Sequence, residues 1–132
     1  MTELDINFIA LGLSIVICSM LGAVWYSPKG FGTKWLQAQG KTMDELGSPV
    51  PPLIVQLFAT AFICLTVGYI DMLYRQALLP AGMHAVFCAA LLLQTWAARL
   101  WLGFNRTVAI IDTGYVAVLL AVPSLAFCFI TF

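Results

Sequence analysis

Two side chains that could carry charge inside an apolar environment flank a short polar connection near the end of the chain. Arg99 and Asp112 each interrupt a long apolar run, with Asn105-Arg106 between them. Ionisable groups at membrane depth are costly and are default functional candidates. Helices joined by so short a connection are antiparallel, so the sequence predicts an intramembrane Arg99–Asp112 ion pair. The pair could serve a transport path or be structural, and Arg99 could instead extend its guanidinium to the membrane surface.

A second polar group is expected at the opposite end of the same helices. Asp71 and His84 flank the turn around Leu79-Pro80, and Asn7 should lie on the same side. A His–Asp pair can titrate near neutral pH. The sequence predicts an outer polar pair of Asp71 and His84 with Asn7 nearby, which could equally be exposed at the headgroup level.

Other polar residues within the apolar runs are amides and a hydroxyl: Gln56, Gln94 and Thr95. Gln94 is the most deeply placed, and one interhelical hydrogen bond would account for it. The four cysteines lie in apolar runs without metal-ligand spacing and are expected to be small buried hydrophobes. The sequence contains no Ser-His-Asp pattern or phosphate-binding glycine loop. We therefore predict no catalytic, cofactor-binding or metal-ligating residues.

Composition places these residues in a membrane protein. Of the 132 residues, 62% are hydrophobic and 9% are charged, whereas soluble domains carry about 25% charged residues. A soluble chain this short could not bury so much apolar surface. The formal net charge is zero, so nucleic acid is not an expected partner.

The apolar runs predict an all-α integral membrane fold, an antiparallel bundle of four transmembrane helices in one domain, residues 1–132. A span needs about 20 residues, and the expected spans are about 6–26, 52–74, 81–104 and 107–131, with a kink at Pro123. The first run is interpreted as a span rather than a signal peptide, because Glu3 and Asp5 precede it and no Lys or Arg does. The loop at 27–51 is expected to hold a short interfacial helix, about 33–39.

Basic residues predict the orientation. Five of the six, Lys29, Lys34, Lys41, Arg99 and Arg106, fall on one side, and only Arg75 falls on the other. The positive-inside rule then puts the 27–51 loop in the cytoplasm and both termini outside.

Small residues at four-residue steps predict helix-packing seams. The first span has Ala10, Ser14, Cys18 and Gly22, the second has Thr60, Cys64 and Gly68, and the third has Ala81, Ala85 and Ala89. These seams could pack the helices of one chain together or join several copies.

The end of the first span carries an aromatic and glycine-containing motif. Its residues are Trp25, Tyr26, Ser27, Pro28, Phe31, Gly32 and Trp35. Aromatic side chains favour the membrane interface, and the proline and glycine favour a turn. We interpret the motif as an elbow at the membrane surface.

The stretch from Gly22 to Trp35, which contains this motif, resembles the signature of a bacterial membrane family catalogued as domain of unknown function 1761. Asn7, the 101–104 segment and the 111–115 segment are also similar to that family, whose members often carry Asn at the position of Asp112. The resemblance implies four spans and a bacterial inner membrane, and it implies no established activity, substrate or cofactor.

These features predict a non-enzymatic inner-membrane protein whose partners are the lipid bilayer and either further copies of itself or a larger membrane complex. A small oligomeric transporter or channel is the alternative. A membrane enzyme using His84, Asp71 and the tyrosines is a third possibility.

Overall fold

The computed structural model describes residues 6–80, 82–101, 103 and 105–130. Its elements are α1 (Phe8–Trp25), α2 (Gly32–Ala38), a 3-10 turn at Met43–Leu46, α3 (Val50–Arg75), α4 (Met83–Trp101) and α5 (Arg106–Phe129). The part of the chain that is described contains no β-strand. Four of these helices, α1, α3, α4 and α5, are long and apolar enough to cross a membrane. The expectation of an all-helical chain with four such helices is confirmed.

The helix boundaries follow local signals in the sequence. The Asn7 side chain accepts hydrogen bonds from the amides of Ile9 and Ala10 and so caps α1. Prolines occupy the first turn of α3, where a missing amide hydrogen costs nothing. Asn105 caps α5 through the amide of Thr107, and α5 continues through Pro123 to Phe129. Ala81, part of the third predicted seam, lies outside the described residues.

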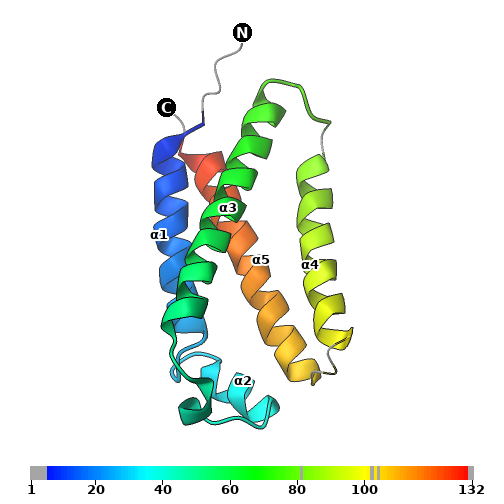
Figure 1. The fold of residues 1–132 in the computed structure, drawn as a ribbon. Helices are drawn as coiled ribbons and strands as arrows, with labels where there is room; N and C mark the ends of the chain where they lie inside the picture. Colours follow the sequence, from blue (N-terminus) through cyan, green and yellow to red (C-terminus); the bar gives the residue numbers. More distant parts are fainter. Residues whose placement is uncertain (1–5, 81, 102, 104, 131–132) are drawn as a thin grey trace.

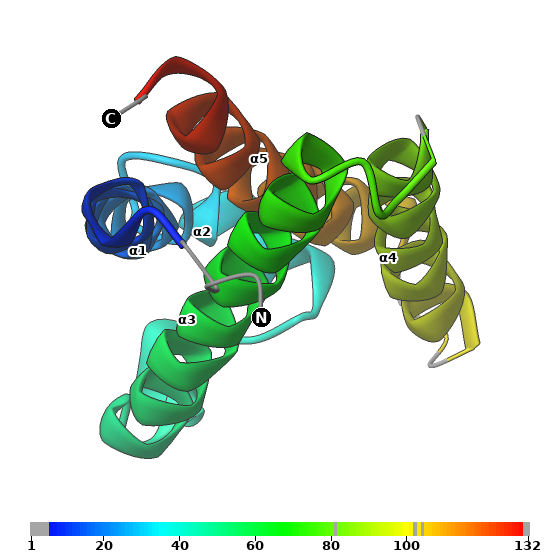
Figure 2. The same cartoon turned by 90° about the horizontal axis from the view of Figure 1, so that it is seen from above.

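The long helices alternate in direction, and α5 lies among the other three (Figure 1). It packs against α1, α3 and α4, and also against the short α2. Seen from above, α1 and α4 lie on opposite sides of α3 and α5 (Figure 2). The first turn of α1 and the last turn of α5 lie at the same end of the molecule, opposite α2 (Figure 1).

The core consists of two clusters that both depend on α5. One joins Ala10 and Val67 to Leu120 and Phe127, and the other joins Cys18 and Cys64 to Tyr115 and Leu119. The small residues predicted as seams in the first two spans lie here, with Ala10, Ser14, Thr60 and Cys64 at most 1% exposed. Their small volume lets α1 and α3 approach α5 closely. The seams of α1 and α3 are therefore used within the chain.

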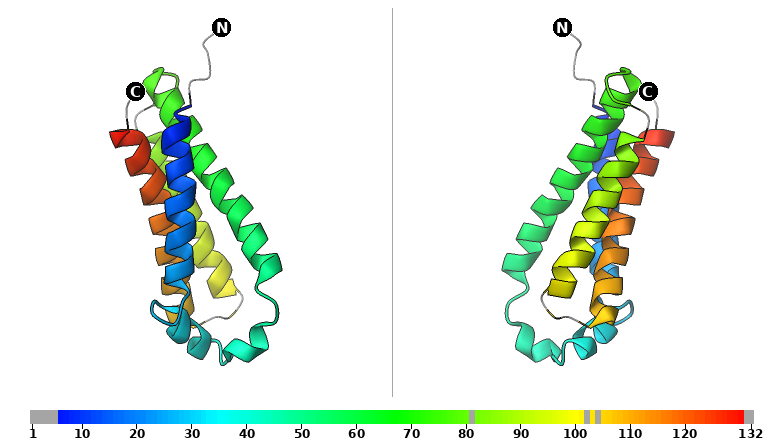
Figure 3. Two further views of the ribbon diagram at one scale, coloured as in Figure 1. Left: turned by 90° about the vertical axis from the view of Figure 1, so that its left-hand side faces the viewer. Right: turned by 90° about the vertical axis from the view of Figure 1, so that its right-hand side faces the viewer.

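The packing is uneven. No described residue of α4 is buried, and Ala85 and Ala89 of the third predicted seam are exposed. The first ten residues of α3, 50–59, are exposed as well, because α3 slants away from α1 and α5 toward its loop end (Figure 3). Cys18 and Cys64 are buried as expected, but Cys128 is exposed, because it lies one position beyond the inward-facing Phe127.

Helices α3 and α5 are in close contact at Gly68, where an added Cβ would overlap the ring of the buried Phe127. We expect Gly68→Ala to lower the free energy of unfolding by about 1–3 kcal/mol, because overpacking forces neighbouring groups to move. Unfolding by a graded SDS titration in mixed micelles measures this change.

Gly12→Ala is the matched control, since a Cβ at Gly12 of α1 meets nothing within 4 Å. Its stability should be unchanged or raised by up to about 1 kcal/mol, the helix-propensity gain. If Gly68→Ala and Gly12→Ala have the same free energy of unfolding, α3 and α5 are not in close contact at Gly68.

Candidate functional site

A buried carboxylate at the loop end of α5 receives contacts from three other parts of the chain. Asp112 is 3% exposed. Its Oδ1 accepts hydrogen bonds from the Tyr26 hydroxyl at 2.7 Å and from Trp35 Nε1 at 2.9 Å. Its Oδ2 lies 2.8 Å from Arg99 Nε. The structure thus brings Arg99 and Asp112 together, and it adds two aromatic donors to the pair.

The elbow positions these two donors. After α1 ends, the Phe31 amide donates to the carbonyl of Trp25, and the Gly32 amide donates to the carbonyl of Ser27. A Cβ at Gly32 would overlap the Tyr26 carbonyl oxygen, so only glycine fits there. The tight turn leads directly into α2, which carries Trp35 back toward Asp112.

Aromatic rings also pack against the Tyr26 donor. The Tyr26 ring meets those of Trp35 and Tyr115 edge-on, with centroids 5.6 and 5.3 Å apart. Trp25 Nε1 donates to the carbonyl of Ile111, one residue before Asp112. The elbow was interpreted from sequence as an interfacial anchor. The polar atoms of three of its four aromatic residues, Trp25, Tyr26 and Trp35, bond to α5, and the interfacial position stays a prediction.

The partners of Asp112 limit the chemistry open to it. A buried charge is tolerated when it is paired and hydrogen-bonded. Oδ1 accepts two hydrogen bonds, whereas Oδ2 accepts none from the described residues and is held by its ion pair with Arg99. Hydrogen bonds to an ionised acceptor are roughly twice as strong as neutral ones. The arrangement joins α2, α4 and the C-terminal end of α1 to α5. Its first role is to hold these elements together.

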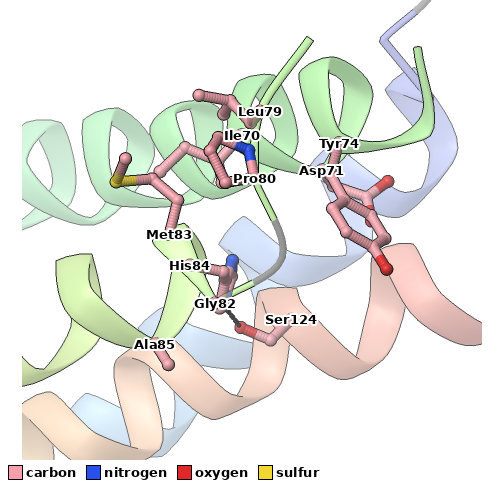
Figure 4. Close-up of a pocket in the computed structure, with 10 residues that line it drawn as sticks. All are labelled: Ile70, Asp71, Tyr74, Leu79, Pro80, Gly82, Met83, His84, Ala85 and Ser124. Carbon is pink, nitrogen blue, oxygen red and sulfur yellow. Dashed lines mark hydrogen bonds between the residues drawn. The ribbon is translucent and has the colours of Figure 1, made fainter. Parts of the chain in front are cut away.

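The predicted outer pair does not form directly. Asp71 makes an ion pair with Arg75 at 2.7 Å, one helical turn further along α3. His84 Nε2 lies 2.8 Å from the Ser124 hydroxyl, which itself donates to the carbonyl of Leu120. Ser124 therefore accepts from His84, because a hydroxyl has one proton to donate. Asp71 and His84 both line a cavity of about 360 Å³ between α3, α4 and α5 (Figure 4).

Asn7 is not part of that cavity lining. Besides capping α1, its amide donates to the carbonyl of Ile130 at 2.7 Å. This bond ties the start of α1 to the end of α5. The three residues of the predicted outer group thus have three separate partners.

A second cavity, of about 410 Å³, lies on the loop side between α1, α3 and α5. Gln56 Nε2 donates to the Tyr115 hydroxyl at 3.3 Å and to Thr60 Oγ1 at 3.4 Å along its wall. Gln56 was expected as a polar residue within its span, whereas the contact with Tyr115 was not predicted. The sequence feature that could have indicated this contact is Gly22, because the absence of a side chain there lets the Tyr115 hydroxyl lie against α1.

No family model matches this chain, and no curated protein or solved structure is significantly similar to it. The resemblance carried by the 22–35 segment therefore stays a prediction.

We expect Asp112→Leu to lower the free energy of unfolding by about 1–3 kcal/mol, the cost of leaving buried donors without their acceptor. The change removes the acceptor of Tyr26 and Trp35 and ends the ion pair with Arg99. Asp112→Asn keeps an acceptor oxygen and should lower the free energy of unfolding by less. SDS titration of both variants measures the difference.

Asp71→Asn is the matched control, because it removes an ion pair between side chains that are 26% and 49% exposed. Such exposed pairs one helical turn apart contribute about 0.3–0.5 kcal/mol. Equal losses for Asp112→Leu and Asp71→Asn would show that the Asp112 cluster does not stabilise the fold.

Proposed function

We propose that this chain is a small multi-pass protein of the bacterial inner membrane with no enzymatic role, which works by associating with further copies of itself or with a larger membrane complex. In this proposal the four long helices form a transmembrane bundle with both termini outside the cytoplasm. The placement of five basic residues on the loop side supports that orientation. The resemblance of the 22–35 segment to domain of unknown function 1761 supports the membrane assignment.

The observation that carries the proposal is the outer surface of α4. Gln94 is exposed, and its amide makes no hydrogen bond with any residue that the structure describes. It lies seven residues before the end of α4, which is about 10 Å at 1.5 Å per residue. An unpaired amide at that depth in hydrocarbon costs several kcal/mol.

The residues around Gln94 allow a second helix to approach. Ala90 and Ala98 lie one turn to either side of it, and both are exposed. Small residues of this kind permit close contact between transmembrane helices. An amide both donates and accepts, so two copies of Gln94 can satisfy each other across a two-fold interface. The proposal therefore favours self-association through α4.

We expect Gln94→Leu to weaken self-association in lipid roughly five- to thirty-fold, which corresponds to about 1–2 kcal/mol for an interhelical hydrogen bond. Energy transfer between donor- and acceptor-labelled copies, measured across a series of protein-to-lipid ratios, gives the association constant. Ala90→Leu should weaken association as well, because it holds the two backbones apart.

Thr66→Val is the matched control, since Thr66 is an exposed polar residue of α3 whose hydroxyl already donates to Phe62 of its own helix. Its association constant should equal that of the unaltered chain. A chain that is monomeric at every ratio and co-purifies with no membrane partner would contradict the proposal.

A transporter or channel is the second candidate, and the buried charge of Asp112 favours it. Intramembrane carboxylates often mark ion or proton paths. Against this role, Asp112 is held by Tyr26, Trp35 and Arg99. Flux of protons and small cations into liposomes should be the same for the unaltered chain, Asp112→Asn and empty vesicles. A flux that Asp112→Asn abolishes would replace the leading proposal with this one.

A further inference from the structure

The loop-side cavity has the size and the lining of a ligand site. Its volume of about 410 Å³ lies in the range of small-molecule pockets, about 300–1,000 Å³. Its walls are mostly apolar, with Gly22 and Ala23 of α1 facing Leu53 and Leu57 of α3. The polar groups gather at one place, where Gln56, Thr60 and Tyr115 meet. Apolar walls with a few convergent polar groups are typical of binding sites.

The position of the cavity makes it reachable from the bilayer. It lies where α3 slants away from α1 and α5 (Figure 3). The part of α3 that forms one wall is exposed from residue 50 to residue 59. A molecule can therefore enter sideways from the lipid, between α1 and α3.

The polar group still has hydrogen-bonding capacity. The Tyr115 hydroxyl accepts from Gln56, so its own proton remains available to donate. Gln56 Nε2 carries two protons, and its bonds to Thr60 and Tyr115 are long, at 3.4 and 3.3 Å. The wall thus offers donors for an acceptor such as an ester carbonyl.

The depth of these donors matches the level of lipid esters. With 26 residues, α3 is about 39 Å long at 1.5 Å per residue, some 9 Å longer than a hydrocarbon core of about 30 Å. Gln56 lies six residues into α3, about 9 Å from its start. Gln56 therefore lies in the quarter of α3 nearest the loop, the part of a span closest to the acyl esters at the edge of the hydrocarbon core.

The charge at the mouth favours a negative headgroup. Lys29 follows three residues after Tyr26, which lines the cavity. Lys34 and Lys41 belong to the same loop, as do Asp44 and Glu45, and Arg106 lies at the same end of the molecule. Apart from the Arg99–Asp112 pair, four basic residues therefore outnumber two acidic ones at this end. Basic pockets between spans on the cytoplasmic side suit anionic lipid headgroups.

We propose that the cavity between α1, α3 and α5 is a specific site for one acyl chain of an anionic glycerophospholipid, whose ester carbonyl is hydrogen-bonded by Gln56 and Tyr115. The lipid fills the gap that the slanted α3 leaves open. Its phosphate lies at the level of the loop lysines. The site is independent of self-association through α4, because α4 does not line it.

The test measures dissociation constants for the first lipid bound to the delipidated full chain in detergent, by native mass spectrometry. The probes are dioleoyl phosphatidylglycerol, which is anionic, and dioleoyl phosphatidylethanolamine, which has the same acyl chains and no net charge. We expect phosphatidylglycerol to bind at least fivefold more tightly.

The variants separate the cavity from the rest of the surface. Leu57→Trp and Ala23→Trp fill the cavity from opposite walls and should weaken phosphatidylglycerol binding at least tenfold. Gln56→Leu removes one donor and should weaken it about fivefold, the effect of one hydrogen bond. Val55→Trp is the matched control, because Val55 is 68% exposed on the same helix and does not line the cavity. Its affinity should equal that of the unaltered chain.

SDS titration first establishes that each variant is as stable as the unaltered chain. Gln56→Leu is the least disruptive change, and it provides the test if the tryptophan variants do not fold. Undiminished phosphatidylglycerol binding by the folded variants would overturn the proposal. So would equal affinity for the two lipids, which would indicate nonspecific acyl contact only.

Discussion

The packing of this chain depends on one buried carboxylate. Asp112 of α5 holds the hydroxyl of Tyr26, the indole of Trp35 and the guanidinium of Arg99. These groups come from the end of α1, from α2 and from α4, so a single charge joins four parts of the chain at one end of the molecule. In an apolar environment such a charge must be satisfied by the protein itself, which makes these contacts mutually dependent.

The helices around the Asp112 cluster pack to very unequal extents. α1 and α3 present small residues to α5 and bury them, whereas α4 packs mainly against α5 and buries none of its described residues. At the loop end α3 also departs from α1 and leaves a cavity. Packing is therefore close along α5 and open on two flanks, which are the outer surface of α4 and the gap between α1 and α3 at the loop end. Our proposals assign one flank, the α4 surface, to a second copy and the other to a lipid.

Much of the fold could be predicted because apolar length, prolines and asparagine caps act locally. The nearness of Arg99 and Asp112 followed from equal depth on two helices joined by a short connection. The roles of Tyr26 and Trp35 could not be predicted, because they depend on how closely the elbow turns at Gly32. The predicted Asp71–His84 pair was wrong as a direct contact for a reason visible in the sequence. Arg75 stands one helical turn after Asp71, and such neighbours on the same helix face one another.

The central claim is that Asp112 binds the elbow to α5, and the coupling between Tyr26 and Asp112 tests it most directly. A double-mutant cycle compares Tyr26→Phe, Asp112→Ala and the double variant by SDS titration in lipid-containing micelles. The 2.7 Å hydrogen bond to a buried charge predicts a coupling free energy of about 1.5–3 kcal/mol. Strictly additive losses, with Tyr26→Phe equally destabilising in both backgrounds, would contradict the account.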